Sequence, residues 1–341
     1  MSKVTLKDVA DKAGVHPSTV SRALDPAKGY LVRDDTVARV RTVAEELGYQ
    51  GDAVASGLRR GRTNTLGVVV ADLGNPFIAP VVRGIENQLE GRGLMALIAE
   101  TRDDHGRMSR VMNNLAARRV DAAIVTGART GDERLLRRAQ QQMPVVLASR
   151  YLPGSGIPAI IHDDERGGGL AAEHLLQLGH RCIAQLCGPA DISSFYERAT
   201  GFRSRLEADG VVALEPDETA ARPVMAEGRR LMELFLDQHD ELPTAIFAHN
   251  DLMAFGALEA LGVRGLSCPQ DVAIVGYNDT PMTAFTNPPI TTVRLPGYEL
   301  GRMAADTAVM LIEGGQQTGS SLVLQPVLVP RHSTLGWHAT A

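Results

Sequence analysis

Apolar and polar positions in the N-terminal part of the chain recur with helical spacing. Thr5 precedes an apolar run and Asp8 stands three positions later, which is the pattern of a capping box, so a helix is predicted to start here. Gly14 breaks this helix at a tight turn. Pro17 suits the first turn of a second helix, where its missing N–H is no loss. A third amphipathic helix is predicted over residues 37–47.

From Thr65 onward the pattern changes to short apolar runs without polar alternation, each followed by a helical segment. Such strands predict a parallel sheet covered on both faces. The pattern occurs twice in tandem, which predicts two α/β lobes with a cleft between them, and ligands of parallel sheets bind beyond the carboxyl ends of the strands. The predicted strands are 66–73, 94–100, 121–127, 143–150, 182–188, 244–250 and 271–279, with short strands near 322–324 and 327–329.

Charge is divided unevenly along the chain, whose net charge is −5. Residues 1–62 hold 11 Lys+Arg against 8 Asp+Glu, a net charge of +3, whereas the remainder holds 24 against 32, a net charge of −8. All four lysines fall within the first 28 residues. A positive N-terminal module on an acidic body favours attraction to phosphates at one end only.

Other features bound the class of protein. There is no apolar signal segment and no run near the ~20 apolar residues of a membrane span, so a cytoplasmic location is expected. Cys182, Cys187 and Cys268 are expected to be buried thiols, not a disulfide or metal ligands. No cofactor, metal site or catalytic residue is predicted.

The two N-terminal helices have the pattern of a helix-turn-helix. Val20, Ala23 and Leu24 form an apolar face of the second helix, and Pro17, Ser18, Ser21 and Arg22 lie opposite. Such a helix would lie in the major groove of DNA. The alternative is a two-helix fragment of an ordinary helical bundle.

The segment TLKDVADKAGVHPSTVSRAL resembles the first two helices of the lactose-repressor (LacI/GalR) family of bacterial transcription regulators. The resemblance continues through GRTNTLGVVV, RRVDAAIV, AIFAHNDLMAFGAL, VGYND, PPITTVR and YELGRMAA, over nearly the full length. It implies a helix-turn-helix domain (1–48), a hinge helix or linker (49–62) and a two-lobed periplasmic-binding-protein-like sensor (63–341). Lobe 1 is expected over about 63–161 and 292–325, and lobe 2 over about 162–291 and 326–341.

The resemblance also implies DNA contacts. In the family the hinge helix enters the minor groove, and Leu58, beside Arg59, matches the residue that wedges between base pairs. Gly51 and Gly57 depart from the family pattern and predict a hinge helix that is weak off DNA. Arg22 is expected to contact a base. The remaining expected DNA-contact residues are Thr5, His16, Pro17, Ser18, Thr19 and Ser21. His16 is expected to cap its helix poorly or to reach a phosphate. The DNA partner is a near-palindromic operator bound by a homodimer, with a tetramer as the alternative.

The resemblance further implies a small polar effector between the lobes: a sugar, sugar acid or sugar phosphate. The expected contact residues are Asn75, Phe77, Arg150, Ser194, Arg198, Asn250, Asp251 and Asn278. Ser149 and Asn278 stand where the family commonly has aspartates, while Arg150 and Arg198 remain. The hypothesis is therefore a positive cleft that takes an anionic ligand.

Two other classes of protein compete with this interpretation. Gly167–Ala172 formally satisfies the G-x-G-x-x-A dinucleotide pattern of an enzyme, but it follows an acidic loop instead of a tight turn from a strand. A solute-binding transport protein would have similar lobes, but the basic N-terminal module counts against it. A repressor is the expected class of regulator, and the sequence leaves activation open as the alternative.

Overall fold

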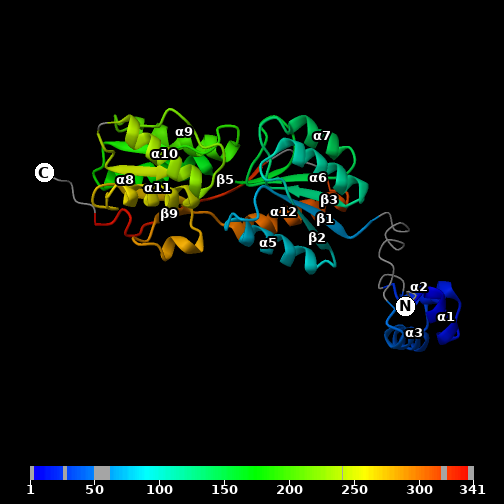
Figure 1. Ribbon diagram of the computed structural model, residues 1–341. Coiled ribbons are helices and arrows are strands. Elements are labelled where there is room, and N and C mark those ends of the chain that lie inside the picture. The colour runs from blue at the N-terminus through cyan, green and yellow to red at the C-terminus, as the bar shows by residue number, and fades with distance from the viewer. Residues whose placement is uncertain (1–3, 26–28, 50–61, 240, 316–320, 337–341) are drawn as a thin grey trace. The chain divides into compact units, whose positions relative to one another are not determined.

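The structure is a computed structural model that describes residues 4–25, 29–49, 62–239, 241–315 and 321–336. It divides into two compact units, Met1–Thr63 and Asn64–Ala341, which are considered separately (Figure 1). No helix among the described residues has the length and apolar character that crossing a membrane requires.

The first unit is a three-helix module, with α1 at Leu6–Ala13, α2 at Pro17–Ala23 and α3 at Asp34–Glu46. The predicted capping box is present, since the Asp8 carboxylate accepts from the Thr5 N–H at 2.7 Å and the Thr5 hydroxyl accepts from the Asp8 N–H at 3.3 Å. Gly14 ends α1 with a φ of 66°, a left-handed conformation that suits glycine. The core of the three-helix module consists of Val9, Ala10, Ala13, Val20, Ala23, Val40 and Ala44.

Lobe 1 of the second unit contains a sheet of six parallel strands among the described residues, in the order β10-β5-β4-β3-β1-β2. The helices α5 and α12 cover one face, and α6 and α7 cover the other (Figure 1). The strands are β1 (Thr65–Val70), β2 (Met95–Glu100), β3 (Ala122–Val125), β4 (Val145–Ala148), β5 (Ala159–His162) and β10 (Ser321–Leu324). The helices are α5 (Ile78–Glu90), α6 (His105–Ala117), α7 (Glu133–Gln140) and α12 (Gly297–Ile312).

Lobe 2 repeats this architecture around a sheet whose described strands run in the order β11-β9-β8-β7-β6. Only β11, which pairs with β9, is antiparallel there. The strands are β6 (Ile183–Leu186), β7 (Ala245–Ala248), β8 (Ala273–Asn278), β9 (Thr291–Arg294) and β11 (Val327–Val329). The helices are α8 (Asp164–Gln177), α9 (Ser193–Glu207), α10 (Met225–Gln238) and α11 (Asp251–Val263), and Pro281–Ala284 forms a 3-10 turn, η2.

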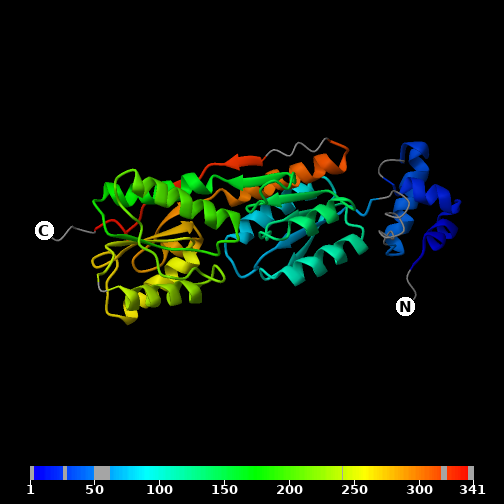
Figure 2. The same cartoon turned by 90° about the horizontal axis from the view of Figure 1, so that it is seen from above.

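The chain passes three times between the lobes, which lie side by side in Figures 1 and 2. The first crossing follows β5 and the third separates β10 from β11, next to the predicted positions 161 and 325. The second crossing was predicted near residue 291, and the structure places it a few residues later. Strand β9 pairs with β8 and β11 in lobe 2, so the chain enters lobe 1 only after Arg294. Strand β5 is a further element that the sequence interpretation did not predict as a strand.

Three helix pairs of the second unit approach one another through glycines on both partners. A Cβ atom built on any of these six glycines would come within 1.8–2.2 Å of a carbonyl oxygen of the facing helix. The pairs are Gly84 with Gly301 (α5/α12), Gly168 with Gly201 (α8/α9) and Gly228 with Gly256 (α10/α11). This contact explains Gly168 in the run that satisfied the dinucleotide pattern, because that run lies inside α8 and packs on α9.

Candidate DNA-binding helix and ligand pocket

Helix α2 presents its polar residues to solvent, as expected of a DNA-binding helix. His16, Ser18 and Arg22 are exposed, while Val20 and Ala23 are buried against the other helices. Pro17 occupies the first turn, where it needs no hydrogen-bond acceptor. The remaining expected contact residues, Thr19 and Ser21, are half-buried at the edge of this face.

His16 is a functional cap of α2, contrary to the expectation of a poor one. Its Nδ1 accepts from the Ser18 N–H at 3.2 Å and lies 2.8 Å from the Ser18 hydroxyl. Thr5 is also engaged locally, because its hydroxyl lies 2.7 Å from the Asp8 carboxylate. Leu58 and Arg59, the expected minor-groove contacts, lie outside the described residues.

A polar pocket lies between the carboxyl ends of the two sheets. Seven of the eight expected effector-contact residues line it. Lobe 1 supplies Asn75, Phe77 and Arg150, and lobe 2 supplies Ser194, Arg198, Asn250 and Asn278. Its volume is about 40 Å³, well below the ~300–1,000 Å³ of typical ligand pockets. The lobes therefore stand close together here, and a sugar-sized molecule requires them to separate.

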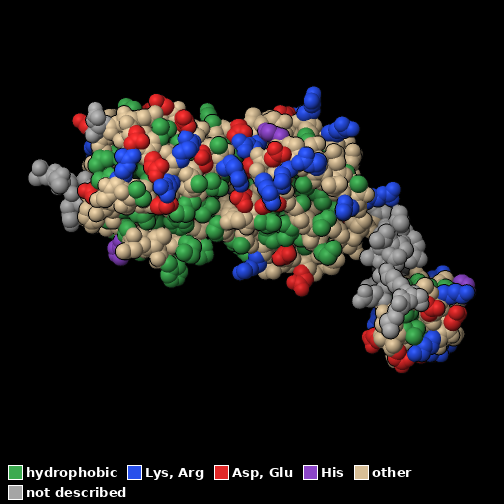
Figure 3. Space-filling model, in the orientation of Figure 1, with side chains coloured by type: hydrophobic (Ala, Val, Ile, Leu, Met, Phe, Trp, Pro, Cys, Tyr) green, Lys and Arg blue, Asp and Glu red, His purple; other side chains and the backbone are tan. Residues whose placement is uncertain are grey.

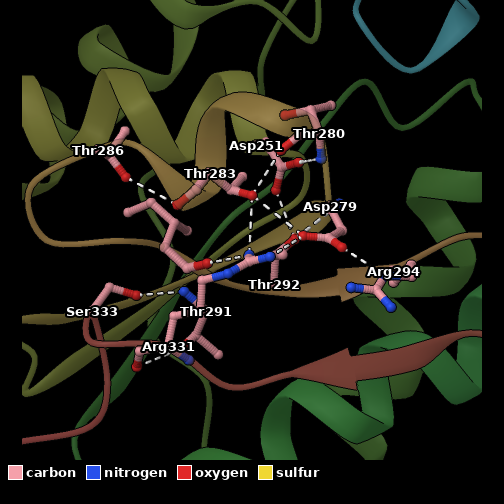
Figure 4. A network of polar contacts seen from close by, with 11 residues as sticks. Asp251, Asp279, Thr280, Thr283, Thr286, Thr291, Thr292, Arg294, Arg331 and Ser333 are labelled. Carbon is pink, nitrogen blue, oxygen red and sulfur yellow. Dashed lines mark hydrogen bonds and ion pairs between the residues drawn. The ribbon is translucent and has the colours of Figure 1, made fainter.

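Asp251 is the expected contact residue that does not line the pocket. Its carboxylate is fully buried and accepts from the Thr280 N–H and the Thr292 hydroxyl, both at 2.7 Å (Figure 4). Burial raises the pKa of Asp251 to about 7, although the Thr280 and Thr292 donors oppose that shift. Asp251 thus ties α11 to β9 and η2, and the carboxylate in the pocket lining is that of Asp72, which lies 3.5 Å from Arg222.

The neighbouring Asp279 also has a structural role. Its carboxylate is 2.6 Å from both Arg294 and Arg331, so it joins β9 to the C-terminal segment (Figure 4). These hydrogen bonds and charges outweigh burial and hold the pKa of Asp279 below its ordinary value.

Arg198 lines the lobe 2 side of the pocket and forms two hydrogen bonds. Its Nε donates to Asp164 at 2.7 Å and its Nη1 donates to the His249 carbonyl at 2.7 Å. The guanidinium carbon also lies 3.9 Å from the centre of the Tyr277 ring, whose hydroxyl donates to the same Asp164 oxygen at 2.9 Å. Burial raises the pKa of Asp164, and Arg198 offsets part of that effect.

Arg150 is the lobe 1 counterpart and is also neutralised. Its Nη1 lies 2.5 Å from Asp103, whose side chain is 3% exposed. With Asp164 paired to Arg198 and Asp103 paired to Arg150, neither arginine contributes an uncompensated positive charge. These two ion pairs argue against the hypothesis of a positive cleft. The compensating carboxylates stand 47 and 34 residues away along the chain, where motif spacing does not connect them to the arginines.

His162, at the end of β5, is a pocket neighbour that sequence reasoning missed. Its ring lies edge-on to Phe77 with the ring centres 5.9 Å apart, and it is 1% exposed. Both ring nitrogens lack a hydrogen-bond partner among the described residues. Burial, assisted by the charge of Arg198, lowers the pKa of His162 to about 3, so the imidazole is neutral. A signal was available, because this histidine interrupts an apolar run at the first crossing between lobes.

Direct contacts hold the lobes together around the pocket. Arg129 of lobe 1 donates to both carboxylate oxygens of Asp191 in lobe 2, each at 2.7 Å. The Tyr151 hydroxyl donates to Glu197 at 2.6 Å, and its N–H donates to the Ser193 hydroxyl at 3.0 Å. The pocket walls are therefore joined by contacts that must break when the lobes separate.

Comparison with known proteins decides the family. The profile for bacterial regulatory proteins of the lacI family matches residues 5–52, and that for the periplasmic binding protein-like domain matches residues 172–334. The chain is 34% identical to the HTH-type transcriptional regulator DegA of Bacillus subtilis (strain 168), over 97% of this chain and 98% of that protein. It belongs to the LacI family. The chain is also 33% identical to the ribose operon repressor of Escherichia coli (strain K12), covering 96% and 99% of the two chains.

Solved structures of LacI-family proteins agree with this assignment. A lac repressor dimer bound to operator and the anti-inducer ONPF superposes with a TM-score of 0.87, at 28% identity and 98% and 100% coverage. The transcriptional regulator CelR in complex with cellobiose gives 0.74, at 31% identity and 97% and 100% coverage. The predicted family and fold class are confirmed. The protein is a transcriptional regulator and not an enzyme, so the alternatives of an α/β enzyme and of a solute-binding transport protein are excluded.

Proposed function

We propose that this regulator is a repressor that binds a near-palindromic operator as a homodimer, and that a neutral, hydroxyl-rich molecule in the interlobe pocket controls its affinity for DNA. We infer that the effector is neutral because the arginines beside the pocket are paired with carboxylates. Arg150 and Arg198 each face a buried carboxylate, so an anionic ligand would meet no free positive charge there. Relatives bind ONPF and cellobiose, and hydroxyl groups are what these ligands share with the proposed one.

The pocket lining supports a ring bearing hydroxyl groups. Phe77 provides an aromatic face, and Asn75 and Asn278 bring side-chain amides to the lining. The Asn250 amide also lines the pocket, but it donates to the Pro223 carbonyl and accepts from the Met253 N–H. The neutral imidazole of His162 can accept one hydrogen bond and donate another, and both positions are unused among the described contacts. A neutral sugar that enters between separated lobes would satisfy these groups as the lobes close.

On DNA, we infer that Arg22 contacts a guanine, while Thr5, His16, Ser18, Thr19 and Ser21 contact phosphates or sugars and Pro17 contacts a thymine methyl group. Leu58 would wedge into the minor groove beside Arg59, as the family resemblance implies. Dimerisation is supported by the exposed apolar side chains Met95 and Ile98 on the edge strand β2. Such a regulator acts in the cytoplasm, where the DNA is.

Isothermal titration calorimetry of the full chain tests the effector class. Ribose, cellobiose and other neutral sugars are titrated in parallel with gluconate and sugar phosphates. We expect a neutral sugar to bind saturably and its anionic analogues to bind much more weakly. Tight binding of an acid, with its neutral analogue inert, contradicts the proposed effector class.

A reporter gene behind the selected operator separates repression from activation, because deletion of the regulator raises expression only for a repressor.

A further inference from the structure

A groove lies between α6 and α7 on the face of lobe 1 opposite α5 and α12. It has a volume of about 650 Å³, which falls within the ~300–1,000 Å³ range of small-molecule sites. The interlobe pocket contributes none of its lining residues. The proposed repressor function assigns it no role.

The sequence explains why this groove exists. The other three helix pairs of the second unit pack closely through facing glycines, such as Gly84 with Gly301. In α6 and α7 the one glycine, Gly106, lies in the first turn of α6 with no atom of α7 among its neighbours. Side chains therefore keep these two helices apart, and the space between them stays open to solvent. Because α6 and α7 have no glycines that face each other, the groove follows from the sequence of these two helices.

Two facing stripes of side chains form the apolar floor. Met112 and Ala116 lie one turn apart on α6, and Leu135 and Ala139 lie one turn apart on α7. Met112 is 3% exposed and Ala139 is 8% exposed, so the floor belongs to the packed core of the lobe. It offers an apolar surface at the bottom of an accessible groove.

The rim is positively charged. Arg134 and Arg138 lie one helical turn apart on α7, and both are exposed. Within the part of the chain that the structure describes, neither has an ion-pair or hydrogen-bond partner for its guanidinium, whereas the adjacent Arg137 pairs with Glu133 at 2.9 Å. Figure 3 shows basic side chains gathered on the face formed by α6 and α7.

The one carboxylate in the lining does not oppose this charge. Asp132 is 3% exposed, lies 2.7 Å from His105 Nδ1, and accepts from the Arg129 N–H at 2.9 Å. Each of its two oxygens therefore has a hydrogen-bond partner. The groove thus differs from the interlobe pocket in charge. The arginines of the pocket have buried carboxylate partners, and Arg134 and Arg138 have none among the described residues.

We propose that the α6/α7 groove is a second ligand site of this regulator, for a small organic anion with an apolar body. Arg134 and Arg138 hold the anionic group, and the apolar body rests on Met112, Ala116, Leu135 and Ala139. The charged rim and apolar floor favour an amphipathic molecule over a free sugar, which would leave the floor uncovered, and over an inorganic anion, which would bind only the rim.

The probe for the test is 1-anilinonaphthalene-8-sulfonate, compared with N-phenyl-1-naphthylamine, which has the same rings without the sulfonate. Fluorescence titrations use the full chain and two groove variants, the double substitution Arg134→Ala/Arg138→Ala and the filling substitution Asn113→Trp. Asn113 is an exposed lining residue, so the indole occupies the groove without entering the core. The matched control is Arg110→Ala/Arg118→Ala, which removes an exposed arginine of α6 and the exposed arginine that caps its C-terminus, both outside the lining.

We expect the sulfonate to bind the unmodified chain saturably and more tightly than the neutral amine. The Arg134→Ala/Arg138→Ala variant should weaken sulfonate binding by about tenfold and leave amine binding nearly unchanged, because only the sulfonate can form ion pairs with the two guanidinium groups. Asn113→Trp should reduce binding of both molecules. Equal sulfonate binding by all variants overturns the proposal, as does an equal loss in the control, which would indicate a general charge effect. If the arginine variant unfolds, Asn113→Trp decides alone.

Discussion

Arg129 of lobe 1 and Asp191 of lobe 2 are joined by two parallel hydrogen bonds of 2.7 Å, next to the pocket that separates the lobes. The Thr130 N–H donates to the Asp191 carbonyl at 2.9 Å, which places a backbone contact between the lobes beside the side-chain pair. Burial opposes ionisation of Asp191, but the Arg129 hydrogen bonds and charge hold its pKa below the ordinary value. This pair therefore stabilises the closed arrangement.

Asp191→Asn should favour separation of the lobes. The substitution removes the charge that Arg129 contacts, and a partly exposed pair contributes up to ~1 kcal/mol, so opening should become roughly two- to fivefold more frequent. Hydrogen–deuterium exchange measures this at the N–H groups of Thr130 and Tyr151, which both donate across the lobes. The control Asp237→Asn breaks a pair with Arg264 inside lobe 2 and should leave both rates unchanged. Unchanged exchange in Asp191→Asn contradicts the assigned role.

Arg22→Ala should relax the sequence preference of DNA binding. A bidentate arginine–guanine contact is worth ~1–3 kcal/mol of discrimination, so the operator should lose about tenfold or more in affinity while random DNA loses little. Fluorescence anisotropy with operator and scrambled duplexes at one salt concentration measures both affinities. Arg39→Ala, an exposed position on α3, is the control. A uniform loss on both duplexes would instead assign Arg22 to a phosphate.

Asp251 should give the sensor a pH-dependent stability. Its pKa rises from the ordinary 3.8 to about 7 in the folded protein, so the folded state binds a proton more tightly than the unfolded chain. Its contribution to the free energy of unfolding therefore falls as pH rises from about 4 to about 7, and is constant above that range. The difference in melting temperature between Asp251→Asn and the unmodified chain should grow in favour of the variant across this window. A difference independent of pH would refute the shift.

His162→Phe should stabilise the protein in the absence of ligand. Each buried polar group without a partner costs ~1–3 kcal/mol, and phenylalanine removes two such nitrogens while keeping a ring against Phe77. We expect the free energy of unfolding to rise by about 1 kcal/mol and the affinity for the effector to fall. The control is His174→Phe, which should be destabilising because its Nε2 lies 2.8 Å from the Thr334 hydroxyl. Chemical denaturation followed by circular dichroism compares them.

The local features of this fold were predictable because they depend on neighbouring residues. The start of α1 at Thr5 and its end at Gly14 follow from hydrogen bonds within a few positions, and the alternating strands and helices follow from burial on both faces of a parallel sheet. The assignment of Asn75, Phe77 and Asn250 to the pocket came from family resemblance together with strand ends.

What the sequence did not reveal depends on contacts between distant segments. The partners of Arg150 and Arg198 lie on other elements, so the charge of the pocket could not be read from the two arginines alone. Asp251 follows a strand end like its neighbour Asn250, yet its hydrogen bonds to β9 turn it away from the pocket. The membership of β9 in lobe 2 likewise depends on pairing with β11, some 35 residues later.

We propose that a small molecule held between the lobes controls the affinity of the N-terminal module for one DNA sequence. Operator fragments are first selected from random duplexes with the full chain. Fluorescence anisotropy then measures its affinity for the enriched duplex with and without each sugar of a panel, at fixed salt. We expect a near-palindromic enriched sequence, and a neutral sugar that changes the affinity of the protein for it about tenfold or more. An absence of enrichment, or an affinity that no sugar in the panel alters, would contradict it.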